Sequence, residues 1–424
     1  MNPPPGRPQE GATEQRSPLG ETARSAQGAV TLPLQGLTII DMTRLLPGPA
    51  ATMHLVDFGA DVIKIEDTGA GDYMRNFPPT VALEGGKTVN AAFEAVNRGK
   101  RSIAIDLKSE PGREVLLRLV DRADALIEGF RPGVLDRLSL GWATLHARNP
   151  RLVLCSLSGY GQHGPLSQRA GHDLNYIAMT GVLDQIRANG QIAIPNLQIG
   201  DLLGGTLSAL ATMLIALLGA QRSGQGVHVD VAMTDGLLAH HLFPHASVDS
   251  GVDPVAGQTL LTGGVACYQI YQTSDQQHLA VGALELKFWQ SFCEAAGLSE
   301  LKSRHWELGE APGTPAASAT IERVAQRIVE HPLEHWLNVF DPVDACVTPV
   351  LTPAEALAHP HHLARNLVHR ERGVSEVGPL AQMAPRDWRS RSAPGHGEHT
   401  SALLTEIGYS AVDAQRMAAA GVVR

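Results

Sequence analysis

The feature that most constrains the fold of this 424-residue chain is a regular alternation of short β-type runs with helical stretches, which begins at Leu34. Five apolar runs have the length and the flanking residues that are typical of strands. They cover residues 37–42, 61–65, 102–107, 125–130 and 152–157. Helical segments such as 110–122 lie between them. Because strands that alternate with helices form mostly parallel sheets covered on both faces, the sequence predicts an α/β fold with a Rossmann-like sheet.

The length of the chain favours two domains. We expect a large α/β domain over 34–230, a linker over 231–262 and a smaller α+β domain over 263–347. Residues 348–424 are expected to link back and return to the large domain. Residues 1–33 are rich in Pro, Gly, Ser and charged residues and lack an apolar segment, which predicts a disordered tail rather than a secretory signal.

Composition excludes several classes of protein. The formal net charge is −9 and no long basic run occurs, so we expect no nucleic-acid partner. The four cysteines are scattered and form no CxxC pair, which argues against a disulfide scaffold and fits a reducing cytoplasm. The most apolar run, 207–220, contains polar residues and is too short to cross a bilayer, so it indicates a buried helix and no membrane association.

One motif is misleading. Residues 159–164 spell GxGxxG directly after a predicted strand. A dinucleotide site needs a helix to begin there, so that its N-terminus faces the pyrophosphate. Pro165 and a polar stretch follow instead, which argues against NAD or FAD.

Basic residues occur next to two of the predicted strands. Arg98, Lys100 and Arg101 precede one strand, and Arg131 follows another. Ligands bind at the strand ends of parallel sheets, and these cations suit a phosphorylated ligand. From charge alone, a solvated surface cluster is the better explanation.

Three residues could carry proton chemistry. His172 can gain or lose a proton near neutral pH, although a single histidine is more often structural. Asp201 stands among glycines before a long apolar helix, where it could face a substrate or simply cap the helix. Glu285 interrupts an apolar stretch and could also be an exposed residue at a strand end. Two histidine groups, around 240–245 and 359–362, lack neighbouring ligands at metal-site spacing, so we expect no metal.

Taken together, several segments resemble the motif series of the family III CoA-transferases. They are residues 46–49 (LPGP), 57–64 (DFGADVIK), 97–102 (NRGKRS), 128–134 (EGFRPGV) and 158–165 (SGYGQHGP). The resemblance runs from about Leu34 to about Arg370. It implies an acyl-CoA thioester as substrate and no cofactor beyond the CoA that this substrate carries. It also implies an interlocked homodimer, in which the large domain of one chain and the small domain of its partner build each active site.

Within that family, residues 170–176 (AGHDLNY), 281–285 and 344–350 resemble the α-methylacyl-CoA racemase branch. This resemblance implies that His172 and Asp201 are the catalytic acid and base and that Glu285 orients His172. It further implies that Arg98, Lys100, Arg101 and Arg131 lie near CoA.

Other segments resemble the transferase branch. Residues 41–45 and 71–75 look more like CoA-transferases, and 261–266 (LTGGVA) replaces a racemase-like segment that lines the acyl pocket. Racemisation removes the α-proton of the thioester and returns a proton from the other face, which requires two groups such as His172 and Asp201. The alternative is CoA transfer, in which Asp201 acts as a nucleophile and forms thioester intermediates. A CoA-binding protein without catalysis would leave His172, Asp201 and Glu285 with no role.

Overall fold

The computed structural model describes residues 32–424 except 84–85, 87, 371–372 and 384–390. At its centre is a parallel six-stranded sheet in the order β10-β7-β6-β1-β2-β5. The strands are β1 (Thr38–Met42), β2 (Asp61–Glu66), β5 (Arg101–Ala104), β6 (Ala125–Glu128), β7 (Val153–Ser158) and β10 (His228–Ala232). The predicted α/β fold is therefore confirmed. The sequence does not predict β10, because the first and third residues of this edge strand, His228 and Asp230, are polar and exposed.

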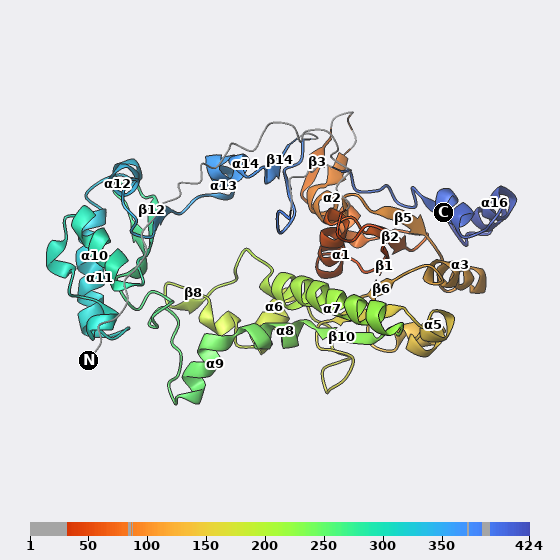
Figure 1. The fold of residues 1–424 in the computed structure, drawn as a ribbon, viewed down its shortest axis with the longest axis horizontal. Helices are drawn as coiled ribbons and strands as arrows, with labels where there is room; N and C mark the ends of the chain where they lie inside the picture. The colour runs from red at the N-terminus through yellow and green to blue at the C-terminus, as the bar shows by residue number, and fades with distance from the viewer. Residues whose placement is uncertain (1–31, 84–85, 87, 371–372, 384–390) are drawn as a thin grey trace, which may run out of the picture.

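Helices cover both faces of the sheet, because consecutive strand residues point to opposite sides. Ile39 and Ile127 pack toward α1 and α7, whereas Ile40 and Leu126 pack toward α3, α5, α15 and α16. The helices are α1 (Pro47–Asp57), α7 (Ser208–Ser223), α3 (Glu110–Val120), α5 (Trp142–Arg148), α15 (Thr400–Glu406) and α16 (Ala411–Ala419). The last two bring the C-terminal segment back to the large sheet beside β5, as Figure 1 shows.

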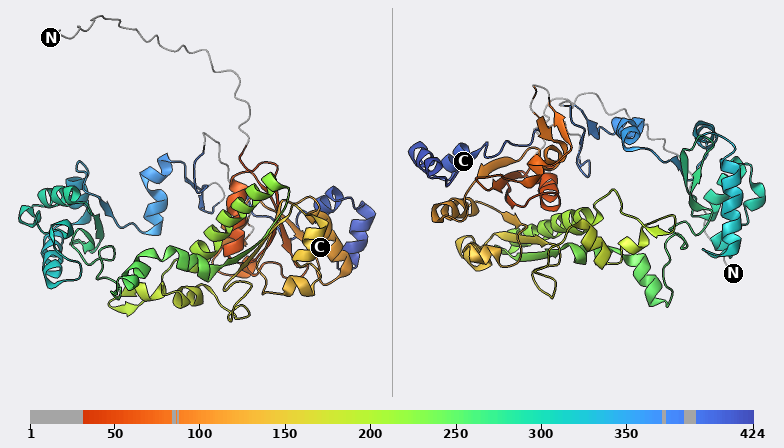
Figure 2. Two further views of the ribbon diagram at one scale, coloured as in Figure 1. Left: turned by 60° about the horizontal axis from the view of Figure 1, so that its bottom comes forward. Right: turned by 180° about the vertical axis from the view of Figure 1, so that it is seen from behind.

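A second, smaller body contains an antiparallel sheet in the order β11-β12-β13. Its elements are β11 (Tyr268–Gln272), β12 (His278–Gly282), β13 (Val347–Pro349), α10 (Leu286–Ala295), α11 (Pro315–Ile328), α12 (Leu333–Phe340), η4 (Ser299–Leu301) and η5 (Trp306–Leu308). Trp289, Phe292 and Trp336 are fully buried in its core. Figures 1 and 2 show this small domain at one end of an elongated molecule, joined to the rest through α9 and through α13 and α14.

Shorter elements complete the chain. Around the large sheet are η1 (Tyr73–Asn76), β3 (Thr80–Ala82), β4 (Thr88–Asn90), α2 (Ala91–Asn97), α4 (Val134–Arg137), α6 (Asp173–Met179), η2 (Leu183–Gln185), β8 (Arg187–Ala188), β9 (Gln191–Ile192) and η3 (Gly200–Leu207). The connections to the small domain contain α8 (Met233–His240), α9 (Leu242–Asp249), α13 (Pro353–Ala358), α14 (Pro360–Ala364), β14 (Val368–His369) and β15 (Glu376–Val377).

The structure differs from the sequence-based expectations in two places. The expected linker 231–262 contains the end of β10 and the short helices α8 and α9, which are too short to show clear periodicity. The apolar run 207–220 belongs to a continuous helical segment, Gly200–Ser223, which by length and composition could cross a membrane, as the core helix of a soluble protein also could. One of its faces packs on the large sheet, while Ile215 is 70% exposed. The expected tail, residues 1–33, lies almost entirely outside the described residues.

Candidate active site

A cavity of about 670 Å³ opens at the carboxyl ends of β1, β6 and β7. The strand ends and the loops after them supply Thr43, Arg44, Leu45, Pro47 and Gly48 at β1, Gly129, Phe130, Arg131 and Pro132 at β6, and Ser158, Gly159 and Tyr160 at β7. The remaining wall contains Arg169, Ala170, Gly171 and His172 before α6, Tyr176 within it, Asp201 in η3 and Met233 in α8. Ligands of open α/β sheets bind at this edge of the sheet.

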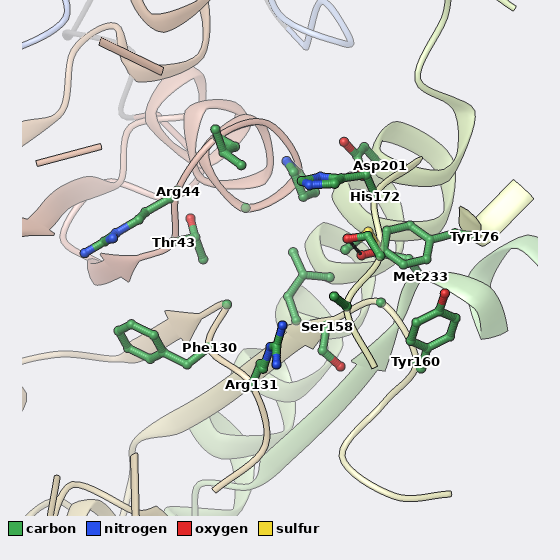
Figure 3. Close-up of a pocket in the computed structure, with 18 of the residues that line it drawn as sticks. Thr43, Arg44, Phe130, Arg131, Ser158, Tyr160, His172, Tyr176, Asp201 and Met233 are labelled. Atoms are coloured by element: carbon green, nitrogen blue, oxygen red, sulfur yellow. Dashed lines mark hydrogen bonds between the residues drawn. The ribbon is translucent and has the colours of Figure 1, made fainter. Parts of the chain in front are cut away.

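His172 lies at the point where α6 begins. Its backbone is extended, and its N–H donates a hydrogen bond to Asn175 Oδ1 at 3.1 Å. The hydroxyl of Tyr176 donates to the carbonyl of Gly171 at 2.6 Å, which fixes the preceding residue. These local bonds hold the backbone of His172 at the cavity wall, where the side chain is exposed (Figure 3).

Asp201 lies in the first turn of η3, a π-helix that continues directly into α7. The N-terminal flanking residue of η3 is Ile199, so Asp201 is not the cap of this helix. Its backbone N–H donates to Asp173 Oδ1 at 2.9 Å. Burial and the nearby charge of Asp173 raise the pKa of the Asp201 carboxyl to about 7. Because strongly shifted carboxyl groups in cavities are typical of acid–base sites, Asp201 is a candidate proton donor and acceptor near neutral pH.

Two glycines explain why η3 can pack so tightly. A Cβ atom at Gly204 would lie 2.3 Å from the carbonyl oxygen of Met233. A Cβ atom at Gly200 would lie 3.0 Å from Asp173 Oδ1. Glycine therefore permits the close approach of α8 and of the Asp173 carboxylate, which places Asp201 at the cavity.

Glu285 does not line this cavity. It directly precedes α10 in the small domain, which Figure 1 shows apart from the large sheet. Within one chain, the structure therefore does not bring Glu285 to His172. Its orienting role stays a prediction that requires a second copy of the chain.

The four predicted CoA-binding cations separate into two groups. Arg131 follows β6 and lines the cavity. The buried Arg98 forms an ion pair with Asp57 at 2.6 Å, and the buried Lys100 forms one with Asp41 at 3.0 Å. Arg101 pairs with Asp61 and Glu406. Arg98 and Lys100 precede β5, and Arg101 is its first residue. These three cations therefore lie where a strand begins and do not line the cavity, which opens where strands end.

A second cavity of about 260 Å³ adjoins the first. Both are lined by Met42, Arg44, Phe130 and Val134, so Arg44 lies at their boundary. Lys108 adds a second cation to the smaller cavity. Two adjoining cavities that share Arg44, with Arg131 in the larger and Lys108 in the smaller, suit an elongated ligand that carries phosphates.

Sequence reasoning misses Arg44 and Asp173 as site residues. Arg44 follows β1 as Arg131 follows β6, so the rule that ligands bind at the carboxyl ends of strands could have found it. No local pattern reveals Asp173, because it bonds Asp201 across 28 positions of sequence.

In the GxGxxG motif of residues 159–164, the first glycine allows the ring of Tyr176 to pack closely against the backbone. The next helix, α6, begins only at Asp173, and a Cβ atom at Gly159 would lie 2.3 Å from the ring of Tyr176. The ring of Tyr160 packs edge-on against that of Tyr176, with centroids 5.3 Å apart. Among the described residues, no group of three or more His, Cys, Asp or Glu side chains could hold a metal ion.

Comparisons with known proteins agree with these features. The model of the CoA-transferase family III matches residues 34–400. The chain is 34% identical to the human α-methylacyl-CoA racemase over 385 residues, which cover 89% of this chain and 94% of that protein. It is 33% identical to the acetyl-CoA:oxalate CoA-transferase of Acetobacter aceti, covering 88% of this chain and 96% of that protein. A crystal structure of a CAIB/BAIF family protein from Brucella suis has a TM-score of 0.77 and 28% identity, covering 89% of this chain and 100% of that one.

Proposed function

The chain belongs to the CoA-transferase family III, and from this premise we propose that it is an acyl-CoA racemase that inverts the α-carbon of 2-methylacyl-CoA thioesters. The observation that carries the proposal is that His172 and Asp201, two groups of different acid–base chemistry, line one cavity. Relatives of the chain include both racemases and CoA-transferases, and all of these act on CoA compounds.

The mechanism uses one group as base and the other as acid. For one enantiomer, the neutral imidazole of His172 removes the α-proton and becomes an imidazolium, which leaves an enolate. The protonated carboxyl of Asp201 then delivers its proton to the opposite face of the carbon and becomes a carboxylate. The reverse sequence converts the other enantiomer. At pH 7 an ordinary aspartic acid is protonated in only about one molecule in a thousand. The raised pKa of Asp201, about 7, supports the proposal because both forms are then populated.

The CoA portion of the substrate would extend from this site toward the smaller cavity. Arg44 and Arg131 offer guanidinium groups to its phosphates, and Lys108 offers an ammonium group farther along. The reacting thioester would then remain beside His172 and Asp201 in the larger cavity.

Replacing Arg131 with Ala is expected to raise KM for acyl-CoA roughly tenfold or more while kcat changes little, because a phosphate contact binds substrate and transition state alike. Steady-state kinetics measure both constants. Arg118→Ala on α3 is the matched control, since Arg118 is a surface arginine outside both cavities. An unchanged KM in Arg131→Ala would contradict this binding mode.

The pKa of Asp201 predicts the pH dependence of the reaction. Below pH 7 the carboxyl becomes protonated and cannot act as a base. We therefore expect kcat/KM for the enantiomer deprotonated by Asp201 to fall about tenfold per pH unit there. Asp173→Asn keeps an acceptor for the Asp201 N–H but removes the like charge, so it should move this acidic limb to lower pH. An acidic limb at the same pH in both proteins would show that the charge of Asp173 does not raise the pKa of Asp201.

The second candidate function is CoA transfer. The 33% identity to an acetyl-CoA:oxalate CoA-transferase favours it, and Asp201 could serve as its nucleophile. Hydroxylamine distinguishes the two functions, because it traps a thioester at Asp201 only if transfer occurs. A single enantiomer of a 2-methylacyl-CoA should be converted to the racemate without an acceptor acid if the proposed function is right.

We further propose that the active enzyme is an interlocked homodimer. Several large apolar side chains are exposed to solvent in the single chain, among them Ile194 (74% exposed), Ile215 (70%) and Phe243 (72%). Exposed apolar surface of this kind is typical of an interface. A second copy would cover it and could bring its Glu285 to His172. Analytical ultracentrifugation should find a stable dimer, and an active monomer would exclude this arrangement.

A further inference from the structure

The turn that carries Arg44 rests on charged side chains that are buried beneath it. Lys64 on β2 and Asp72 before η1 are both fully buried. Their Nζ and Oδ2 atoms lie 2.9 Å apart and form an ion pair. Neither residue lines either cavity, so neither can touch a ligand there.

Both members of this pair bond the backbone on the two sides of Arg44. Lys64 Nζ donates to the carbonyl of Thr43 at 3.0 Å. On the other side, the N–H of Leu45 donates to Asp72 Oδ1 at 3.1 Å. Leu45 has a φ of 63°, in the left-handed region that residues with side chains rarely adopt. This turn therefore depends on bonds from outside it.

The segment that supplies Asp72 also contacts the Arg44 side chain. Asp67 Oδ2 lies 2.9 Å from an Arg44 guanidinium nitrogen. The guanidinium also lies over the ring of Tyr73, 5.0 Å from its centroid. Residues 67–73 thus fix both the backbone and the side chain of Arg44, and Lys64 ties this segment to β2.

The buried pair is poorly explained as a source of stability. Removing an ammonium and a carboxylate from water costs free energy that their attraction only partly recovers, and apolar residues of similar volume often stabilise a protein as well or better. In some proteins a buried polar or ionic group instead fixes one defined arrangement of the groups bonded to it.

We propose that Lys64 and Asp72 are positioning residues that hold the turn of residues 43–45 so that Arg44 faces the CoA portion of the substrate. This inference rests on the proposed function, because it takes CoA as the ligand of Arg44. A turn released from the pair would let the guanidinium move away from the boundary of the two cavities, and CoA would bind less tightly.

The test compares Lys64→Met, Asp72→Asn and the double variant, with free CoA as the probe in isothermal titration calorimetry. We expect the Kd of CoA and the KM for acyl-CoA to rise roughly tenfold, with a much smaller change in kcat, because the pair acts on binding geometry. Leu119→Ala, a buried residue of α3, is the control for destabilisation. It should lower Tm without changing Kd. If the single variants do not fold, the Kd of CoA is measured on the double variant instead. Replacing both members of the pair leaves neither of them as an unpaired buried charge.

A double-mutant cycle with Arg44→Ala separates positioning from a merely structural role. In the Arg44→Ala background, Lys64→Met should raise Kd no further, because the side chain that the pair positions is gone. A folded Lys64→Met protein that binds CoA as tightly as wild type, or fully additive effects in the cycle, would overturn the inference alone. A wild-type protein that binds no CoA would overturn the proposed function and this inference with it.

Discussion

Asp201→Asn is expected to abolish racemisation, with a loss in kcat on the order of 10²–10⁴-fold, the range for removal of a positioned acid–base group. Asparagine has nearly the same shape as aspartate but cannot exchange a proton. The hydrogen bond to Asp173 comes from the backbone N–H of residue 201, so it survives the substitution. The variant should therefore fold normally and still bind CoA.

The same variant has a stereochemical signature. It should lose exchange of the C2 proton for the enantiomer that Asp201 deprotonates and retain some exchange for the enantiomer that His172 deprotonates. Proton NMR in D₂O, started from each pure enantiomer, measures both rates. Asp121→Asn, at a surface carboxylate paired with Arg148, is the matched control and should behave as wild type. Equal loss of exchange for both enantiomers would show that Asp201 has another role.

His172→Ala is expected to give the converse result, with the loss of exchange in the other enantiomer. Racemisation should stop, and exchange should fall by about 10²–10⁴-fold only for the enantiomer that the imidazole deprotonates. A transferase does not need a base at this position, so substantial CoA transfer by His172→Ala would favour the alternative function. The control is His163→Ala, because His163 is also exposed and precedes α6 but does not line the cavity.

The parallel sheet could be predicted because its strands are short apolar runs bounded by turn residues. All five runs that the sequence marks are strands of the large sheet. The edge strand β10 was not predicted because two of its five residues, His228 and Asp230, are exposed and polar. The helix of residues 207–220 was recognisable from its apolar composition, but no simple periodicity reveals the π-helix η3 (Gly200–Leu207) that leads into it.

The sequence predicts residues of the candidate site only where they belong to a recognisable local motif. His172 and Asp201 belong to recognisable segments, and both line the cavity. The sequence does not distinguish the cations of residues 98–101 from Arg131 as candidate phosphate contacts. In the structure Arg98 and Lys100 lie before β5, Arg101 is its first residue, and all three are paired with carboxylates, whereas Arg131 follows a strand. The raised pKa of Asp201 depends on burial and on the nearby charge of Asp173, which are properties of the folded chain.

The most direct test of this account is to incubate the wild-type protein with one pure enantiomer of a 2-methylacyl-CoA in D₂O and to follow deuterium and configuration at C2. We expect one deuterium to enter at C2 while the sample becomes racemic, since both steps pass through the same enolate. No deuterium at C2 of either enantiomer, together with a hydroxylamine-trapped thioester at Asp201, would contradict the racemase and identify a CoA-transferase.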